Sequence, residues 1–132
     1  MIQRDYFIRL IQEFMAAVTR FLEKKEGEDK KDLEMKDLYR QYVGSYDVIR
    51  NLSFEELLTY AQEQWEEKQR IQRLEMVAEL YYAEACYKAE PLHAILLNKA
   101  WKVFDYVNTH GADYSIDRMQ KMQRIHTELD KR

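Results

Sequence analysis

The chain has 132 residues, of which 34% are charged, and its 24 acidic and 21 basic side chains give a net charge of −3. A chain of this length buries about two-thirds of the surface that it exposes when unfolded, so a single domain over residues 1–132 needs no disulfide or metal for stability. Only three Gly and one Pro occur, although sheets and βα units need both residues in their turns. The composition therefore predicts long helices and disfavours β-sandwiches, Rossmann domains and P-loop enzymes.

The cysteine content and the distribution of charge indicate where such a chain works. Its single cysteine, Cys86, excludes an internal disulfide and a Cys-based zinc site, and is compatible with a reducing compartment. The charged start, residues 1–5, lacks the apolar core of a signal peptide, and no run approaches 18 apolar residues. A slightly negative chain offers no electrostatic surface for nucleic acid. We therefore expect a cytoplasmic protein that binds neither membranes nor nucleic acid.

The first predicted helix spans residues 2–25. Its apolar residues are spaced by three and four, which places them on one side of a helix: Phe7, Leu10, Ile11, Phe14, Val18, Phe21 and Leu22. Ile8 and Met15 lie beside this stripe, so the apolar surface is broad enough for two neighbours. Gly27 suits a left-handed position that ends the helix.

The next segment predicts a shorter helix over residues 32–43. The charged residues 28–32 before it are expected to form a solvated connection. Gly44 ends the helix because glycine tolerates the backbone conformation needed there. Residues 45–52 are then predicted to be the longest irregular connection.

Residues 53–90 contain neither Gly nor Pro and allow one long helix or two shorter ones. Ser53 and Glu56 form a capping box, in which each side chain binds the other residue's backbone amide, so a helix begins there. Only one large apolar residue, Trp65, interrupts the polar run at 62–68. Because a compact domain cannot cover a helix of about 55 Å on all its turns, we predict a break in this run.

The second half of the chain predicts three helices. The segment 71–89 is apolar around much of its circumference, which is typical of a central helix, and its small residues, such as Ala85, allow a close helix crossing. A further helix runs from residue 92 to about 108, after Pro91 in its first turn. The last helix begins at the N-cap Ser115. The prediction is an all-α fold of about six antiparallel helices.

Two resemblances to known proteins accompany this pattern. Ala83 and Tyr87, followed by the run 100–104 (AWKVF), resemble a tetratricopeptide-type helical hairpin. Residues 1–7 (MIQRDYF) and 80–85 (LYYAEA) are similar to a bacterial family of all-helical proteins of unknown function, over most of the chain. The resemblance implies a helical, tetratricopeptide-like fold and carries no activity and no catalytic residue.

Candidate chemical groups each have a simpler structural interpretation. His93, His110 and His126 lie on three separate elements and lack the i,i+4 spacing of a helical zinc site. Cys86 has no adjacent cation to lower its pKa, which predicts a buried, inert thiol. Glu79 is expected to be solvated. The sequence therefore predicts no catalytic residue, no cofactor and no metal.

The basic and aromatic residues give the remaining candidate surfaces. Arg118, Lys121 and Arg124 recur every three positions and predict a solvated face of the last helix. The ten tyrosines exceed what a core needs, because each buried hydroxyl requires a partner. They therefore allow a binding surface as well as packing at helix boundaries with the hydroxyls in water. The residues predicted to take part in interactions are Tyr82, Tyr87, Leu97, Trp101 and Tyr106.

Two classes of function remain open. The first is a non-catalytic, tetratricopeptide-like interaction module with a protein partner. The alternative is a small helical ligand-binding protein or enzyme with an internal site of Tyr and Glu, which a deep pocket at Tyr82, Glu84 and Tyr106 would favour. A DNA-associated regulator would need a basic recognition helix, and these helices are too long and too acidic for that.

The supply of apolar residues also predicts self-association. Ile8 and Met15 on the first helix, and Leu97 and Trp101 on the fifth, remain after each helix has one face in the core. Apolar patches that a chain cannot cover usually mark an interaction site, and two-fold association is the commonest way to cover them. We therefore expect a homodimer.

Overall fold

The computed structural model describes residues 2–131, with side chains from residue 5 onward. Seven helices make up this part of the chain, and no strand occurs in it. The helices are α1 (Ile2–Glu23), α2 (Glu28–Tyr42), α3 (Tyr46–Ile49), α4 (Phe54–Gln64), α5 (Glu67–Ala85), α6 (Leu92–His110) and α7 (Ile116–Asp130). The predicted all-α fold is confirmed, with one short helix, α3, more than expected.

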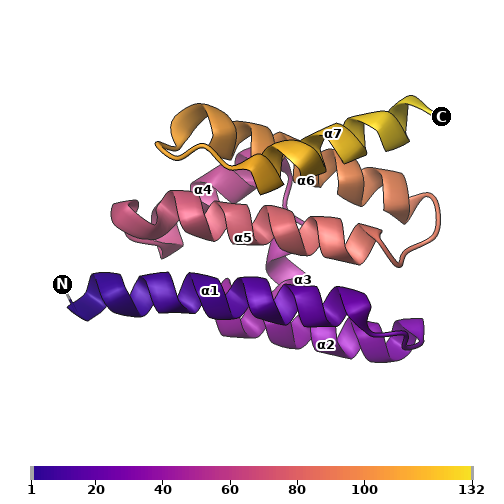
Figure 1. Ribbon diagram of the computed structural model, residues 1–132, viewed down its shortest axis with the longest axis horizontal. Helices are drawn as coiled ribbons and strands as arrows, with labels where there is room; N and C mark the ends of the chain where they lie inside the picture. Colours follow the sequence, from indigo (N-terminus) through magenta and orange to yellow (C-terminus); the bar gives the residue numbers. More distant parts are fainter. Residues whose placement is uncertain (1, 132) are drawn as a thin grey trace.

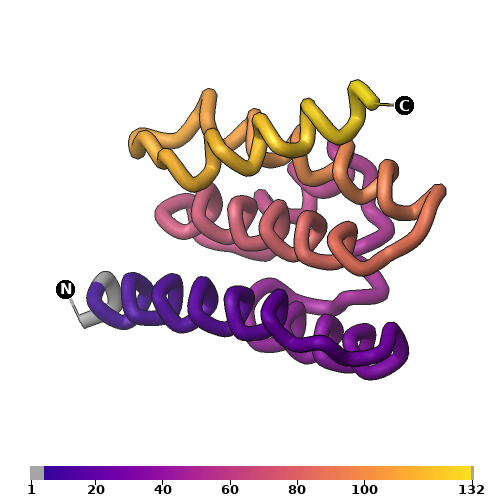
Figure 2. Tube along the Cα trace, turned by 45° about the vertical axis from the view of Figure 1, so that its right-hand side comes forward, coloured from indigo at the N-terminus to yellow at the C-terminus, as the bar shows by residue number. Residues whose placement is uncertain are grey.

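The helices are arranged around α5. Figure 1 shows the α1–α2 hairpin on one side of α5 and the α6–α7 pair on the other, with successive long helices running antiparallel. The turned view in Figure 2 shows the same order of layers. Helix α5 contacts α1, α2, α4 and α6, so it is the central helix that its apolar circumference predicts.

Small residues bring α6 close to α5. Ala78, Ala83 and Ala85 are completely buried on α5, and Ala100 is completely buried on α6. Small buried residues such as these allow neighbouring helix backbones to approach closely. Contacts between α5 and α6 are accordingly the most extensive in the molecule.

The break between α4 and α5 is confirmed. Helix α4 ends at Gln64, and the backbone of Trp65 is extended before α5 begins at Glu67. The capping box at the start of α4 is also present: the Glu56 amide donates to Ser53 Oγ at 3.1 Å, and the Ser53 amide donates to Glu56 Oε1 at 2.8 Å.

Two predicted connections contain helix instead. Gly27 has a φ of −66° and precedes α2 as its N-cap, so residues 28–32 are helical. Lys31 explains this early start, because it is buried and its Nζ donates to the Phe21 carbonyl at the end of α1, 2.9 Å away. The segment 45–52 contains the short helix α3. Gly44 ends α2 as predicted, with a φ of +141°.

The polar faces predicted for α5 and α7 are wrong in part. Arg118 and Lys121 are buried, because each forms an ion pair with a carboxylate from α5. Glu79, expected in solvent, is buried as the partner of Lys121. Periodicity along one helix misses such pairs, because their members lie 42 and 43 residues apart. Conversely, Leu22, which the spacing places on the apolar stripe of the first helix, is exposed. Leu33 on α2 and Ile95 on α6 are further large apolar residues that are exposed.

Candidate functional site

The five residues predicted to take part in interactions do not form one surface. Leu97 is only 3% exposed and lies in the core, so its prediction as an interface residue is wrong. Trp101 and Tyr82 are half-buried and pack against the core. Tyr87 follows the end of α5, whereas Tyr106 lies near the end of α6. Because α5 and α6 are antiparallel, these two tyrosines lie at opposite ends of the hairpin (Figure 1).

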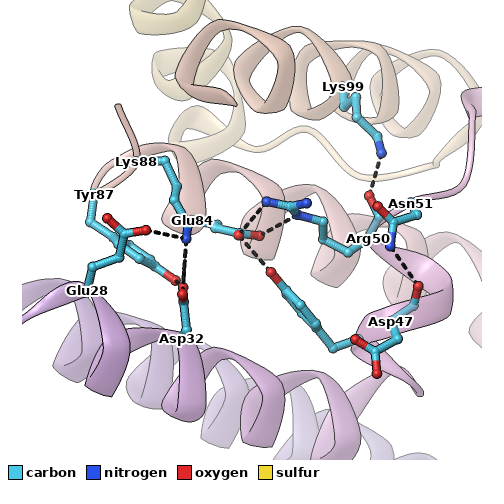
Figure 3. Close-up of polar contacts among 10 residues, drawn as sticks. Glu28, Asp32, Asp47, Arg50, Asn51, Glu84, Tyr87, Lys88 and Lys99 are labelled. Carbon is cyan, nitrogen blue, oxygen red and sulfur yellow. Dashed lines mark hydrogen bonds and ion pairs between the residues drawn. The ribbon is translucent and has the colours of Figure 1, made fainter. Parts of the chain in front are cut away.

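A buried carboxylate on α5 organises a cluster of polar side chains instead. Glu84 is completely buried on α5. Its Oε2 accepts hydrogen bonds from the Tyr46 hydroxyl at 2.8 Å and from Arg50 Nη2 at 2.9 Å, and its Oε1 accepts from Arg50 Nε at 3.2 Å. Figure 3 shows the guanidinium of Arg50 directed at Glu84. We refer to Tyr46, Arg50 and Glu84 as the Glu84 cluster.

The backbone of α3 is held by the same region. The Tyr81 hydroxyl donates to the Ile49 carbonyl at 2.7 Å, and Lys99 Nζ donates to the Arg50 carbonyl at 2.6 Å. Figure 3 shows Lys99 reaching this carbonyl from α6. Helix α3 is only four residues long, which is too short to be stable in isolation. These polar contacts with α5 and α6 therefore hold it in place.

A second polar group ties the start of α2 to the end of α5. The Tyr87 hydroxyl donates to Asp32 Oδ1 at 2.5 Å, and Lys88 Nζ lies 2.9 Å from Asp32 and 2.8 Å from Glu28 (Figure 3). Burial alone would raise the pKa of Asp32, but the hydrogen bonds from Tyr87 and Lys88 outweigh it and lower that pKa. The pKa of Tyr87 is raised by burial and by this carboxylate.

These contacts give three of the tyrosines a structural role within the chain. Three hydroxyls donate to groups of the chain itself, those of Tyr46, Tyr81 and Tyr87. Burial and the neighbouring Glu84 raise the pKa of Tyr46, so its hydroxyl stays protonated as a donor. Both oxygens of Glu84 accept hydrogen bonds from the chain itself, and the carboxylate is completely buried. Neither sequence interpretation of the tyrosines, a binding surface or hydroxyls in water, describes these three.

An apolar groove lies on the opposite side of α5, between α1 and α7. Its cavity has a volume of about 270 Å³. Figure 1 shows α5 running between α1 and α7. The groove is defined by Ile11 and Met15 from α1, Gln72 and Met76 from α5, and Ser115 and Asp117 at the start of α7. We call it the α1–α5–α7 groove.

Ion pairs between α5 and α7 fix one wall of this groove. Lys121 Nζ lies 2.7 Å from Glu79 and 2.8 Å from Asp117. Burial lowers the pKa of Lys121, but these two carboxylates outweigh it and raise that pKa. Nearby, Arg118 Nη1 lies 2.9 Å from Glu75. Since buried charges are tolerated only when they are paired and hydrogen-bonded, these contacts hold α7 at a defined position on α5.

The remaining chemical candidates have structural partners. His93 Nδ1 lies 2.6 Å from the Ala85 carbonyl, and its Nε2 lies 3.3 Å from Glu128. Within residues 2–131, no group of three or more His, Cys, Asp or Glu side chains is placed to hold a metal. Cys86 is exposed rather than buried, because α5 ends at Ala85, four residues earlier than predicted. Over the same residues, no helix is long and apolar enough to span a membrane.

Comparison with known proteins gives no match to a family model, a curated protein or a solved structure. The resemblances to a bacterial all-helical family and to tetratricopeptide hairpins therefore stay predictions. What this chain does is accordingly inferred from the α1–α5–α7 groove, the Glu84 cluster and the apolar residues that the fold leaves exposed.

Proposed function

We propose that the protein is a non-catalytic, tetratricopeptide-like helical interaction module that forms a homodimer through α1. The carrying observation is a second apolar stripe on α1, made of Ile8, Met15 and Leu22, beside the stripe that enters the core. Ile8 is 45% exposed and Leu22 is 39% exposed, although both are large apolar residues. Met15 lies between them and also lines the α1–α5–α7 groove.

The position of the stripe favours a helical partner. Its three residues recur every seven positions, or about two helical turns, so they lie along one line on α1. The groove beside this line continues the apolar surface onto α5 through Met76. A helix laid along α1 would cover both the stripe and the groove, and contiguous apolar surface of this kind usually marks an interaction site.

A second copy of the chain fits this surface because the stripe is symmetric about Met15. A two-fold interface requires a patch that complements itself. If α1 packs antiparallel against α1 of a second copy, with the axis at Met15, then Ile8 faces Leu22 of the partner subunit. The same packing repeats at the other end of the helix, so the three apolar residues of each copy are covered at once.

Charged residues flank the apolar stripe. Asp5 precedes Ile8 on α1, and Lys25 follows the helix, which ends at Glu23. Both side chains are exposed, and neither forms an ion pair within the described residues. A covered stripe would therefore have a charged rim at each end, as protein–protein interfaces usually do.

Sedimentation equilibrium at micromolar concentration tests this function. We expect the wild-type chain, with a mass of 16.1 kDa, to sediment as a dimer. Ile8→Glu places a carboxylate opposite an apolar residue in both halves of the interface. It should cost about 3 kcal/mol or more of association free energy, and so raise the dissociation constant about 100-fold.

Ile95→Glu is the matched control, because Ile95 is 51% exposed on α6 and is not part of the stripe. It should leave the dissociation constant unchanged. A wild-type chain that stays at 16.1 kDa would contradict the proposed function. A dimer that both variants weaken equally would place the interface elsewhere.

A further inference from the structure

A second cavity, outside the proposed dimer interface, lies between α6 and the segment that leads into α4. Its volume is about 330 Å³, which falls within the range of small-molecule sites. Leu52, Phe54 and Val103 give it an apolar wall, and Lys99 and Lys102 from α6 line it as well. The two lysines are three residues apart and therefore lie on the same face of the helix.

Lys99 is a fixed cation without a carboxylate partner. Its Nζ donates to the Arg50 carbonyl and lies 4.8 Å from the centre of the Tyr81 ring. Among residues 5–131, no carboxylate lies within 4 Å of this ammonium. Burial lowers the pKa of Lys99 and the nearby Arg50 lowers it further, whereas Glu84 and Glu56 offset part of this effect. Since a partly buried ammonium without an ion pair is costly, an anion in the cavity would reduce this cost.

The other polar groups at the cavity limit the charge of that anion. Lys102 is exposed and makes no ion pair in the described residues. Glu55 and Glu56 also line the cavity, and Glu56 is occupied by the capping box with Ser53. Two ammoniums beside two carboxylates suit a group with a single negative charge better than a phosphate dianion, because the dianion is repelled more strongly by the glutamates.

We propose that this cavity binds a small molecule with a carboxylate head and an apolar body. The carboxylate lies between Lys99 and Lys102, and each ammonium donates a charge-assisted hydrogen bond to it. The apolar body packs on Leu52, Phe54 and Val103. The assignment goes beyond self-association and concerns a different surface, since α1 contributes no residue to this cavity.

Two-dimensional amide NMR with 3-phenylpropionate tests the proposal on the wild-type protein. The shifts that titrate should belong to residues 51–57 and 99–103. The amide 3-phenylpropanamide has the same shape without the charge, and should bind at least tenfold more weakly, because it loses the charge-assisted hydrogen bonds. Equal binding of the acid and the amide, or shifts elsewhere in the chain, would overturn the proposal.

Variants separate the two lysines from a general effect of positive charge. Lys99→Gln should weaken binding of 3-phenylpropionate at least tenfold. Lys102 is exposed, so Lys102→Gln should fold like the wild type. It should weaken binding severalfold, which keeps the test valid if Lys99→Gln fails to fold. Lys68→Gln is the matched control, since Lys68 is an exposed lysine at the start of α5, and it should bind like the wild type. Unchanged binding in Lys102→Gln, or equal losses in all folded variants, would contradict the assignment.

Discussion

At the scale of single residues, Glu84 is a buried charge that depends on hydrogen bonds from Tyr46 and Arg50. Its carboxylate is completely buried, and its ion pair with Arg50 joins α5 to the segment after α3. Such a pair adds little net stability when it is compared with a well-packed apolar pair, but the loss of one member leaves the other charge buried and unpaired. The effect of a substitution at Glu84 on stability should therefore depend on whether Arg50 is still present.

Substitution of Glu84 should show this dependence. Glu84→Leu is expected to lower the free energy of unfolding by about 3–5 kcal/mol, because Arg50 and the Tyr46 hydroxyl lose their acceptor. The double variant Glu84→Leu with Arg50→Met should recover part of that loss. Urea denaturation followed by circular dichroism measures both. Additive losses in the double variant would mean that the two side chains are not coupled.

Asp32 should make stability depend on pH. Its folded-state pKa is lowered below the ordinary value of 3.8, so its stabilising contribution is present above that value and is lost as the pH falls through the folded pKa. The stability difference between wild type and Asp32→Asn should therefore be constant from neutral pH down to about pH 4, and should begin to close below it.

Asp37→Asn provides the control, because Asp37 lies exposed on the same helix and its ion pair with Arg40 is also exposed, so solvent screens it. Urea midpoints measured from pH 7 to pH 3 should show no comparable convergence for this variant. If the gap between wild type and Asp32→Asn stayed constant over that range, the hydrogen bonds from Tyr87 and Lys88 would not be favouring the charged form.

At the scale of helices, sequence signals predict a helix end reliably where all the residues that form it lie close together in the sequence. The capping box at Ser53, the N-cap at Ser115 and the end of α2 at Gly44 all appear as predicted. Each depends on residues within four positions of one another. The start of α2 is not predictable in this way, because it depends on Lys31 reaching the end of a different helix, α1.

The close crossing of α5 and α6 gives a prediction at this scale. Ala85 is completely buried near the end of α5, so Ala85→Leu should lower the free energy of unfolding by about 1–3 kcal/mol through overpacking. Ala89→Leu, four residues on and exposed after the helix, should have little effect. Thermal unfolding compares the two, and an Ala85→Leu variant as stable as the wild type would show that the crossing has room to spare.

At the scale of the whole molecule, the helical class and the central position of α5 follow from composition and from the apolar pattern. The candidate sites do not. The Glu84 cluster joins residues 34 and 38 positions apart, and the groove requires three helices to be placed together. Periodicity along one helix shows that a residue is apolar or charged, but not which distant partner it meets. For that reason the sequence pattern places Leu97 at an interface and Lys121 in solvent, whereas both are buried.

The second stripe of α1 is the one candidate surface that both the sequence and the fold indicate. Ile8 and Met15 lie beside the core stripe in the sequence, and the fold leaves no helix of the described chain to cover them fully. Leu22 completes the stripe only once the structure shows that it is exposed. Self-association through α1 is thus the claim about the whole molecule that links its sequence, its fold and its proposed function.

Disulfide trapping at the centre of α1 tests that claim most directly. In a Cys86→Ser background, Met15→Cys should form a covalent dimer under mild oxidation, because a two-fold axis at Met15 brings the two Cβ atoms within the roughly 3.5–4.5 Å that a disulfide requires. Ala16→Cys, exposed on the next position of the same helix, should remain monomeric on reducing-agent-free gels. Absence of the Met15→Cys dimer, or equally fast trapping at both positions, would contradict an antiparallel α1 interface.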